Sequence, residues 1–194
     1  MTNPKLLIAG VFLTVALPFG ALLLSSQVQL GGLATAPEEE GGAPYPATVP
    51  GLAVQGRDVY ISLGCIACHT QQVRPSGQGS DIARGYGDRP SVARDYVLQS
   101  HVLLGDRRIG PDLANYGVRA APTPKGTQTE PEKATALAKS LAAVHVAIHH
   151  GNAFAFLYES GTQGEVPSER AATLAAYLLS LRQDYSSPEA KLKK

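Results

Sequence analysis

The stretch GRDVYISLGCIACHTQQVRP, residues 56–75, decides how the rest of the chain is interpreted. It contains Cys65, Cys68 and His69 in the spacing C-x-x-C-H, which is the attachment signature of c-type heme. Two cysteines three positions apart on a helical turn reach the two vinyl groups of a porphyrin, and the histidine that follows directs a ring nitrogen at the iron. The alternative, a redox dithiol that happens to precede a histidine, expects a βαβ context, which this sequence lacks. The motif therefore predicts one covalently attached heme c, with His69 as an axial iron ligand.

The N-terminal segment offers a means of export, which the motif requires because bacterial heme attachment to C-x-x-C-H takes place outside the cytoplasm. Residues 5–26, KLLIAGVFLTVALPFGALLLSS, carry no charge after Lys5. An apolar run of about 20 residues, at about 1.5 Å per residue, spans the roughly 30 Å of a bilayer core. A cleaved signal peptide is the alternative, since LATA at 33–36 offers small residues to a peptidase, but the run is longer than the usual signal core. We therefore predict a retained transmembrane anchor over residues 1–27.

The charges on either side of this segment predict its orientation. Lys5 and the amino terminus precede the apolar run, and three glutamates at 38–40 follow it. By the positive-inside rule, the N-terminus lies in the cytoplasm and the heme domain on the periplasmic side of a bacterial inner membrane, after a single pass. A net charge of +1 gives no reason to expect nucleic acid as a partner.

Composition divides the rest of the chain into three parts. Residues 28–50 are rich in glycine and proline and predict a flexible linker with little capacity to bury surface. Residues 51–185 are predicted to form a mono-heme cytochrome c domain, and residues 186–194 a C-terminal tail.

Helical patterns dominate the predicted domain. They cover residue 52 to Cys65, 91–104, 132–150 and, after an N-cap at Ser168, 170–183. The last pattern carries an apolar stripe at helical spacing, formed by Leu174, Tyr177, Leu178 and Leu181. Because strand signals are almost absent, we predict an all-α fold with one N-terminal transmembrane helix, the linker and a class I-like cytochrome c domain.

Further residues are candidates for contacts with the heme. The second ring nitrogen of an axial histidine needs an orienting partner, usually a backbone carbonyl, and small c-type cytochromes take it from a proline beyond the motif. Pro111, in the turn that follows Gly110, is the candidate, and an ordinary turn is the alternative. Arg74, Arg107 and Arg108 are candidates to pair with the propionates, although exposed arginines without such a role are common.

Three segments together carry a resemblance to a known family. YPATVPGLAVQGRDVYISLGCIACHTQQVRP at 45–75, SHVLLGDRRIGPDLANYGVR at 100–119 and ATLAAYLLSL at 172–181 resemble the membrane-anchored mono-heme cytochrome c subunit of cbb-type (C-family) heme–copper oxidases. The resemblance implies a subunit that passes single electrons toward the catalytic subunit and carries no oxygen chemistry itself. It also implies other subunits of a membrane redox complex as partners, and a soluble cytochrome or an adjacent heme subunit as electron partner.

The sequence departs from this family at the sixth iron ligand, as well as in the loop at 76–90. The family has an axial methionine before the last helix, and the matching position here falls at about Gly151, while the only methionine is Met1. Imidazole is the usual substitute, so we predict His150 as the sixth ligand, with His149 as second choice. His101 and His145 are the other histidines, and a five-coordinate iron is the remaining alternative. Loss of the methionine predicts a lower midpoint potential than in a Met/His relative.

Other functions remain open at this point. The chain could belong to a different membrane complex, photosynthetic or quinol-oxidising. With an open iron it could be a ligand-binding heme sensor or a peroxidase, and as a bracing subunit it could keep heme only as a folding element.

Overall fold

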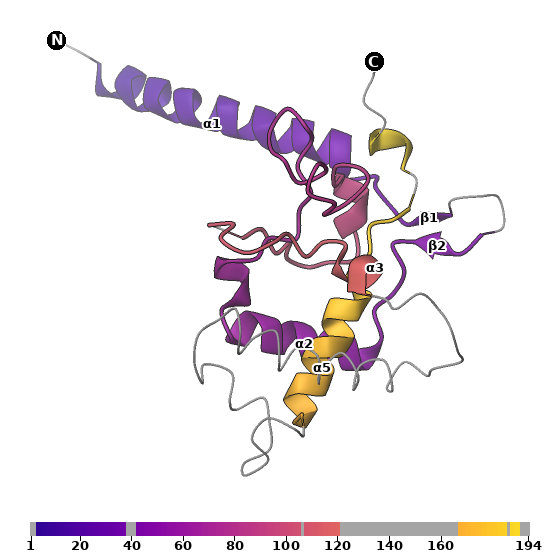
Figure 1. Cartoon of the computed structure of the whole chain (residues 1–194). Coiled ribbons are helices and arrows are strands. Elements are labelled where there is room, and N and C mark those ends of the chain that lie inside the picture. Colours follow the sequence, from indigo (N-terminus) through magenta and orange to yellow (C-terminus); the bar gives the residue numbers. More distant parts are fainter. Residues whose placement is uncertain (1–2, 38–41, 106, 121–166, 186, 191–194) are drawn as a thin grey trace.

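The computed structural model describes residues 3–37, 42–105, 107–120, 167–185 and 187–190. The elements are α1 (Pro4–Leu30), β1 (Ala36–Pro37), β2 (Pro44–Tyr45), α2 (Gly51–Ser62), α3 (Tyr116–Ala120) and α5 (Glu169–Ser180), with 3-10 turns at Cys65–Ala67, Ala93–Tyr96 and Pro188–Ala190 (Figure 1). Apart from one small hairpin, the regular elements of the described part are helical, which confirms the predicted all-α class. The helix predicted over 132–150 lies outside the described residues, as do His145, His149 and His150.

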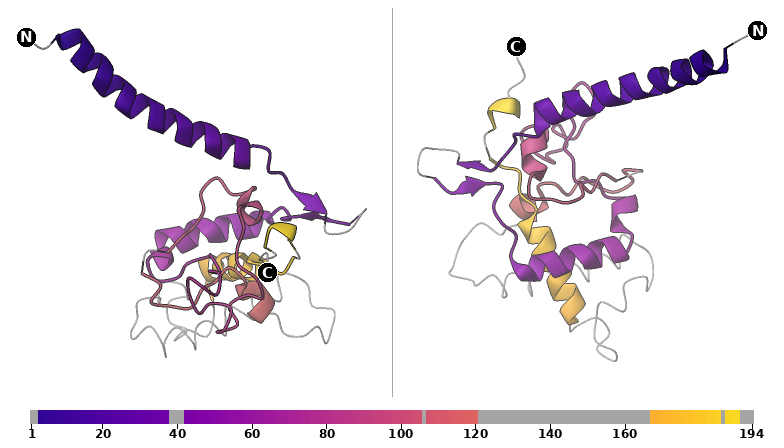
Figure 2. Two further views of the ribbon diagram at one scale, coloured as in Figure 1. Left: turned by 90° about the horizontal axis from the view of Figure 1, so that it is seen from above. Right: turned by 180° about the vertical axis from the view of Figure 1, so that it is seen from behind.

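The N-terminal helix α1 has the dimensions of a membrane span. The side chain of Asn3 caps it by accepting a hydrogen bond from the Lys5 N–H at 3.1 Å. Its 27 residues, none of them buried, extend over about 40 Å at the usual helical rise. Within the described residues it is the one helix that is long and apolar enough to cross a bilayer, judged by length and composition. It ends at Leu30 rather than at residue 27, and it projects away from the other helices in every view (Figure 2).

The core of the domain lies where α2 packs against α5. Gly56 permits a close approach of the two helices, because a Cβ at this position would collide with the Thr173 carbonyl. One turn further along, the rings of Tyr60 and Tyr177 meet at 5.5 Å in a tilted arrangement. The stripe predicted on α5 is buried as expected: Leu174, Tyr177, Leu178 and Leu181.

The last helix begins where the sequence predicts and ends earlier. Ser168 is its N-cap, with the side chain accepting from the Ala171 N–H at 3.3 Å. The predicted end at Gln183 is wrong, because the helix stops at Ser180 and the chain turns away at Leu181. This turn lets the Gln183 N–H donate to the side chain of Asn115 at 2.7 Å, which ties the C-terminal end of the domain to the start of α3.

Two other predicted helices are shorter than expected. α2 ends at Ser62, because Gly64 adopts a left-handed conformation (φ 70°) and redirects the chain into the 3-10 turn at Cys65–Ala67. The prediction of a helix over 91–104 is wrong, since the regular structure in this segment is a single 3-10 turn at Ala93–Tyr96. The backbone beyond it serves tertiary contacts instead, because the Leu103 carbonyl accepts a hydrogen bond from the Gln71 N–H at 3.2 Å.

The segment between anchor and domain is folded back on the molecule. β1 and β2 pair antiparallel, with Ala36 opposite Tyr45 and Pro37 opposite Pro44. None of the described residues in 28–50 is fully buried, but the Tyr45 side chain and the Pro37 carbonyl form hydrogen bonds with the domain.

Candidate heme site

The two cysteines and the histidine of the motif share one turn of chain. The Cys65 carbonyl accepts hydrogen bonds from the N–H groups of Cys68 (3.2 Å) and His69 (2.9 Å). Both cysteines are half-buried and neither forms a disulfide. The predicted motif residues therefore lie on one short stretch of chain shortly after α2, formed by the 3-10 turn at Cys65–Ala67 and the two residues that follow it.

The acidity of Cys65 argues against a redox dithiol. Burial raises the pKa of the Cys65 thiol to about 11, so this group stays protonated at neutral pH. Reactive cysteines of C-x-x-C redox proteins have a lowered pKa, since the thiolate is the nucleophile. A protonated, half-buried thiol fits a thioether partner better than a redox couple.

His69 is oriented from its ring and from its backbone. Its Nδ1–H donates to the Pro111 carbonyl at 2.9 Å, which is the contact expected from the sequence. With the proton on Nδ1, the lone pair of the neutral ring lies on Nε2, the nitrogen that would bind iron. Gly110 lies flat against the ring, since a Cβ there would overlap the imidazole atoms. The hydroxyl of buried Tyr60 donates to the His69 carbonyl at 2.8 Å.

A loop from residue 103 to 113 holds this arrangement by backbone hydrogen bonds to the motif. The N–H groups of Arg107, Gly110 and Leu113 donate to the carbonyls of Ala67, Cys68 and Thr70, at 3.3, 3.0 and 2.8 Å. These bonds place Gly110 and Pro111 beside the His69 ring.

The predicted arginines have different surroundings. Arg74 pairs with buried Asp81 through Nε (2.9 Å) and Nη2 (2.7 Å), and Arg108 reaches the same carboxylate through Nη1 at 3.1 Å. The Arg74 hydrogen bonds, opposed by burial, lower the pKa of Asp81 to about 2. Arg108 also has a positive φ of 47°, a conformation that a non-glycine residue adopts only when its surroundings fix it. Arg107 is exposed, and it contacts the motif through its backbone N–H.

Two guanidinium groups on one carboxylate leave a surplus positive charge. Asp81 is only 4 % exposed, while the side chains of Arg74 and Arg108 are 32 % and 24 % exposed. An anion that approaches from outside can therefore be reached by both arginines while they keep Asp81. Asp81 was not among the residues predicted from the sequence, where it is one acid in a loop rich in polar residues and glycine.

The described residues fit a heme c. They provide two thiols and an oriented imidazole, with a surplus of positive charge on residues from the same loops. Two buried polar atoms on the residues that follow His69, Oγ1 of Thr70 and Nε2 of Gln71, have no hydrogen-bond partner in the described part of the chain. Within the described residues, no group of three His, Cys, Asp or Glu side chains is placed to hold a bare metal ion.

Fold and site together define a class, a membrane-anchored mono-heme cytochrome. The model of the family described as "Cytochrome C oxidase, mono-heme subunit/FixO" matches residues 4–131, and the chain belongs to this family. The resemblance inferred from the sequence is confirmed, and the chain is a mono-heme electron-transfer subunit of a cbb-type oxidase. With α1, this family indicates a single-pass membrane protein in a membrane oxidase complex. The search for individual curated relatives found no match.

Proposed function

We propose that this subunit carries its electrons on one heme c attached through Cys65 and Cys68, with His69 as an axial ligand. The observation that carries this proposal is the imidazole of His69, which follows the two thiols on one turn and is held by the Pro111 carbonyl. The bound heme would supply a one-electron ferric–ferrous couple. The chain itself orients the imidazole, keeps its lone pair on Nε2 and covers it with the loop that carries Gly110.

The arginine pair on Asp81 would hold a heme propionate. Arg74 donates to Asp81 through Nε and Nη2, and Arg108 donates to Asp81 and to Gln72. Both side chains remain partly exposed, so the N–H groups that these bonds leave over, such as those on Nη1 of Arg74, could donate to a second carboxylate. Arg107, which is exposed beside them, is a weaker candidate for the same contact.

The sixth ligand would be an imidazole. The only methionine is Met1, at the start of the chain, so a methionine ligand near the last helix is unavailable. We propose His150 in this position, with His149 as second choice. A bis-histidine iron would have a lower midpoint potential than a Met/His iron.

The anchor would place the heme domain on the periplasmic side, with the N-terminus in the cytoplasm. Lys5 before α1 and three glutamates after it support this orientation. Other subunits of the oxidase would be the partners in the membrane, and an adjacent heme subunit or a soluble cytochrome would exchange electrons with this one.

Heme staining after denaturation tests the attachment. The purified wild-type chain should keep its heme on a denaturing gel, while the variant with both Cys65→Ala and Cys68→Ala should lose it. His69→Ala should keep covalent heme but lose the low-spin spectrum. Covalent heme in the double cysteine variant would contradict the proposed attachment.

The missing methionine makes a second function worth testing, that of a heme that binds small ligands. If the sixth ligand is His150, the reduced protein should not react with CO, and His150→Ala should make it CO-reactive. If His149→Ala does so and His150→Ala does not, the assignment between the two is wrong. Ready CO binding by the wild type would replace the bis-histidine proposal with an open iron.

A further inference from the structure

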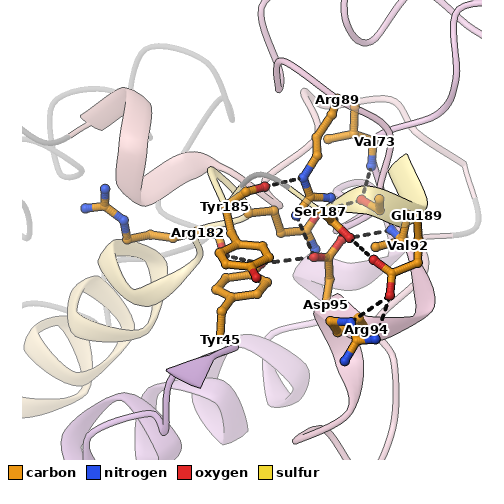
Figure 3. Close-up of polar contacts among 12 residues, drawn as sticks. Tyr45, Val73, Arg89, Val92, Arg94, Asp95, Arg182, Tyr185, Ser187 and Glu189 are labelled. Carbon is orange, nitrogen blue, oxygen red and sulfur yellow. Dashed lines mark hydrogen bonds and ion pairs between the residues drawn. The ribbon is translucent and has the colours of Figure 1, made fainter. Parts of the chain in front are cut away.

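The hairpin between anchor and domain makes contacts that link the two. We call these contacts the clasp; it consists of Ala34, Pro37 and Tyr45 on the anchor side and Arg89, Arg94, Asp95, Tyr185 and Glu189 on the domain side. Figure 3 shows most of these side chains converging from the hairpin, the loop before residue 96 and the C-terminal segment.

The first part of the clasp is a stack of two tyrosines. The rings of Tyr45 and Tyr185 lie 4.5 Å apart with an angle of 3° between their planes. The Tyr185 hydroxyl then donates to the Pro37 carbonyl at 2.9 Å, so Tyr185 contacts both strands of the hairpin. Flat stacking of aromatic rings contributes about 0.5–1.5 kcal/mol beyond the area it buries.

The second part is a buried ion pair that the hairpin completes. Arg89 donates to Asp95 through Nη1 (2.9 Å) and Nη2 (2.7 Å), and the Asp95 side chain is fully buried. The Tyr45 hydroxyl donates to the same carboxylate at 3.1 Å (Figure 3). Burial, followed by the Asp95 charge, raises the pKa of Tyr45 well above its usual value, so it acts as a neutral donor.

The third part holds the chain next to α1. Arg94 donates through Nη1 to the Ala34 carbonyl at 2.5 Å, and its other nitrogens reach Glu189 at 2.6 and 2.8 Å. Hydrogen bonds from Ser187 and Arg94 lower the pKa of Glu189 to about 2, which keeps this carboxylate charged at neutral pH.

The position of these contacts limits how far the domain can move from the membrane. Ala34 lies four positions after Leu30, the end of α1, so the tether up to the first contact reaches about 14 Å at full extension. If the clasp were open, the tether would run from Leu30 to the start of α2 at Gly51, and would reach about 70 Å at full extension.

We propose that the clasp fixes the heme domain beside the membrane end of α1, and that Tyr45 and Arg94 are positioning residues for electron transfer. Electron tunnelling slows steeply with distance, so a domain free to wander would spend little time close enough to its partner. The inference on electron transfer rests on the proposed function, whereas the fixed position of the domain does not depend on it.

Distance measurements on the full-length chain in lipid nanodiscs test this proposal. Spin labels at Ser26→Cys on α1 and Gln55→Cys on α2 should give one narrow distance distribution in the otherwise wild-type chain. Combining Tyr45→Ala with Arg94→Ala should spread the distances over about 25 Å, the root-mean-square length of a free tether of some 20 residues. Asp184→Asn is the control, because it removes the exposed ion pair with Arg182 (2.6 Å) and a charge that acts on Arg89, yet it contacts neither Tyr45 nor Arg94, so the distribution should stay narrow.

The outcomes separate this proposal from the proposed function. Heme staining and the low-spin spectrum should be unchanged in all these variants, since none of the substituted residues touches the motif. If the double variant loses its heme, it has a folding defect. In that case the distance measurement on Arg94→Ala alone, at a partly exposed residue, tests the clasp. Electron transfer from the subunit to the rest of the oxidase should slow in the double variant without a change in midpoint potential. A distribution that is broad in the wild type, or that stays narrow in the heme-loaded double variant, overturns the clasp.

Discussion

Asp81 and Asp95 are both buried aspartates that pair with arginine through two hydrogen bonds, yet their surroundings differ. Asp81 lies between the loops of the heme site and has two arginines, both partly exposed. Asp95 lies in the clasp, where one arginine, Arg89, is 14 % exposed and Tyr45 covers the carboxylate. The pair at Asp81 thus leaves positive charge for another anion, whereas the pair at Asp95 is closed by the hairpin. The same pair of residue types therefore supports a binding role in one region and a fixed contact in the other.

The largest loss of stability is expected from breaking the ion pair between Arg89 and Asp95. Asp95→Ala leaves Arg89 largely buried without its carboxylate and also removes the hydrogen bonds to Tyr45 and the Val92 N–H. Removing one member of a buried ion pair costs about 3–5 kcal/mol in the free energy of unfolding. Denaturant unfolding followed by circular dichroism measures this loss. If Asp95→Ala lowers the free energy of unfolding by less than Asp81→Asn does, the ion pair at Asp95 is not the more tightly closed of the two.

A change at Gly110 should affect the heme site and spare the clasp. Gly110→Ala places a methyl group where the His69 ring lies, so the ring must move. Such overpacking costs about 1–3 kcal/mol, and here it also misdirects the iron ligand. We expect weaker low-spin bands and some CO binding in the visible spectrum, with spin-label distances as in the wild type. Gly77→Ala is the control, because nothing lies within 4 Å of its added Cβ. An unchanged spectrum in Gly110→Ala would show that the ring contact does not orient the ligand.

The ion pairs of Asp81 with Arg74 and Arg108 should make the stability of the fold depend on pH in the acid range. The pKa of Asp81 is about 2 in the folded chain and near 4 when unfolded, so its contribution is present above pH 4 and is lost as the pH falls from 4 toward 2. Allowing for solvent around the two arginines, we expect Asp81→Asn to cost about 1–2 kcal/mol at pH 7. The difference between variant and wild type should shrink below pH 4 in denaturant unfolding. A difference that stays constant down to pH 2 would show that the lost interaction is not the ion pair.

The sequence predicts local features of this molecule well and distant partnerships poorly. The C-x-x-C-H turn, the Ser168 cap and the apolar stripe on α5 depend on residues a few positions apart, so their spacing alone predicts them. The Pro111 contact was predicted from what small c-type cytochromes share. By contrast, the clasp joins Pro37 to Tyr185, which are 148 positions apart, and no local pattern marks either residue as a partner.

The composition of residues 28–50 predicts a linker but does not predict its contacts with the domain. Glycine and proline disfavour a helix, and the described residues 31–37 and 42–50 contain none. They do not argue against docking, because the hairpin binds through backbone carbonyls of Ala34 and Pro37 and through one side chain, Tyr45. Asp81 was missed for a similar reason: its role comes from Arg74 and Arg108, which were considered only as partners of the heme.

The smallest effect is expected from removing one hydroxyl of the clasp. Tyr45→Phe keeps the stack on Tyr185 but removes the hydroxyl, which donates to Asp95 or to the Arg182 carbonyl. Asp95 retains both bonds from Arg89. One such bond is worth about 1 kcal/mol, so the free energy of unfolding should fall by about that amount while the spin-label distances stay narrow. Because the pKa of Tyr45 is raised in the folded chain, its contribution is present below pH 10 and is lost as the pH rises beyond that, so wild type and variant should converge there. A broad distance distribution in Tyr45→Phe would mean that the hydroxyl, and not the stacked ring with the Arg94 contact, holds the hairpin on the domain.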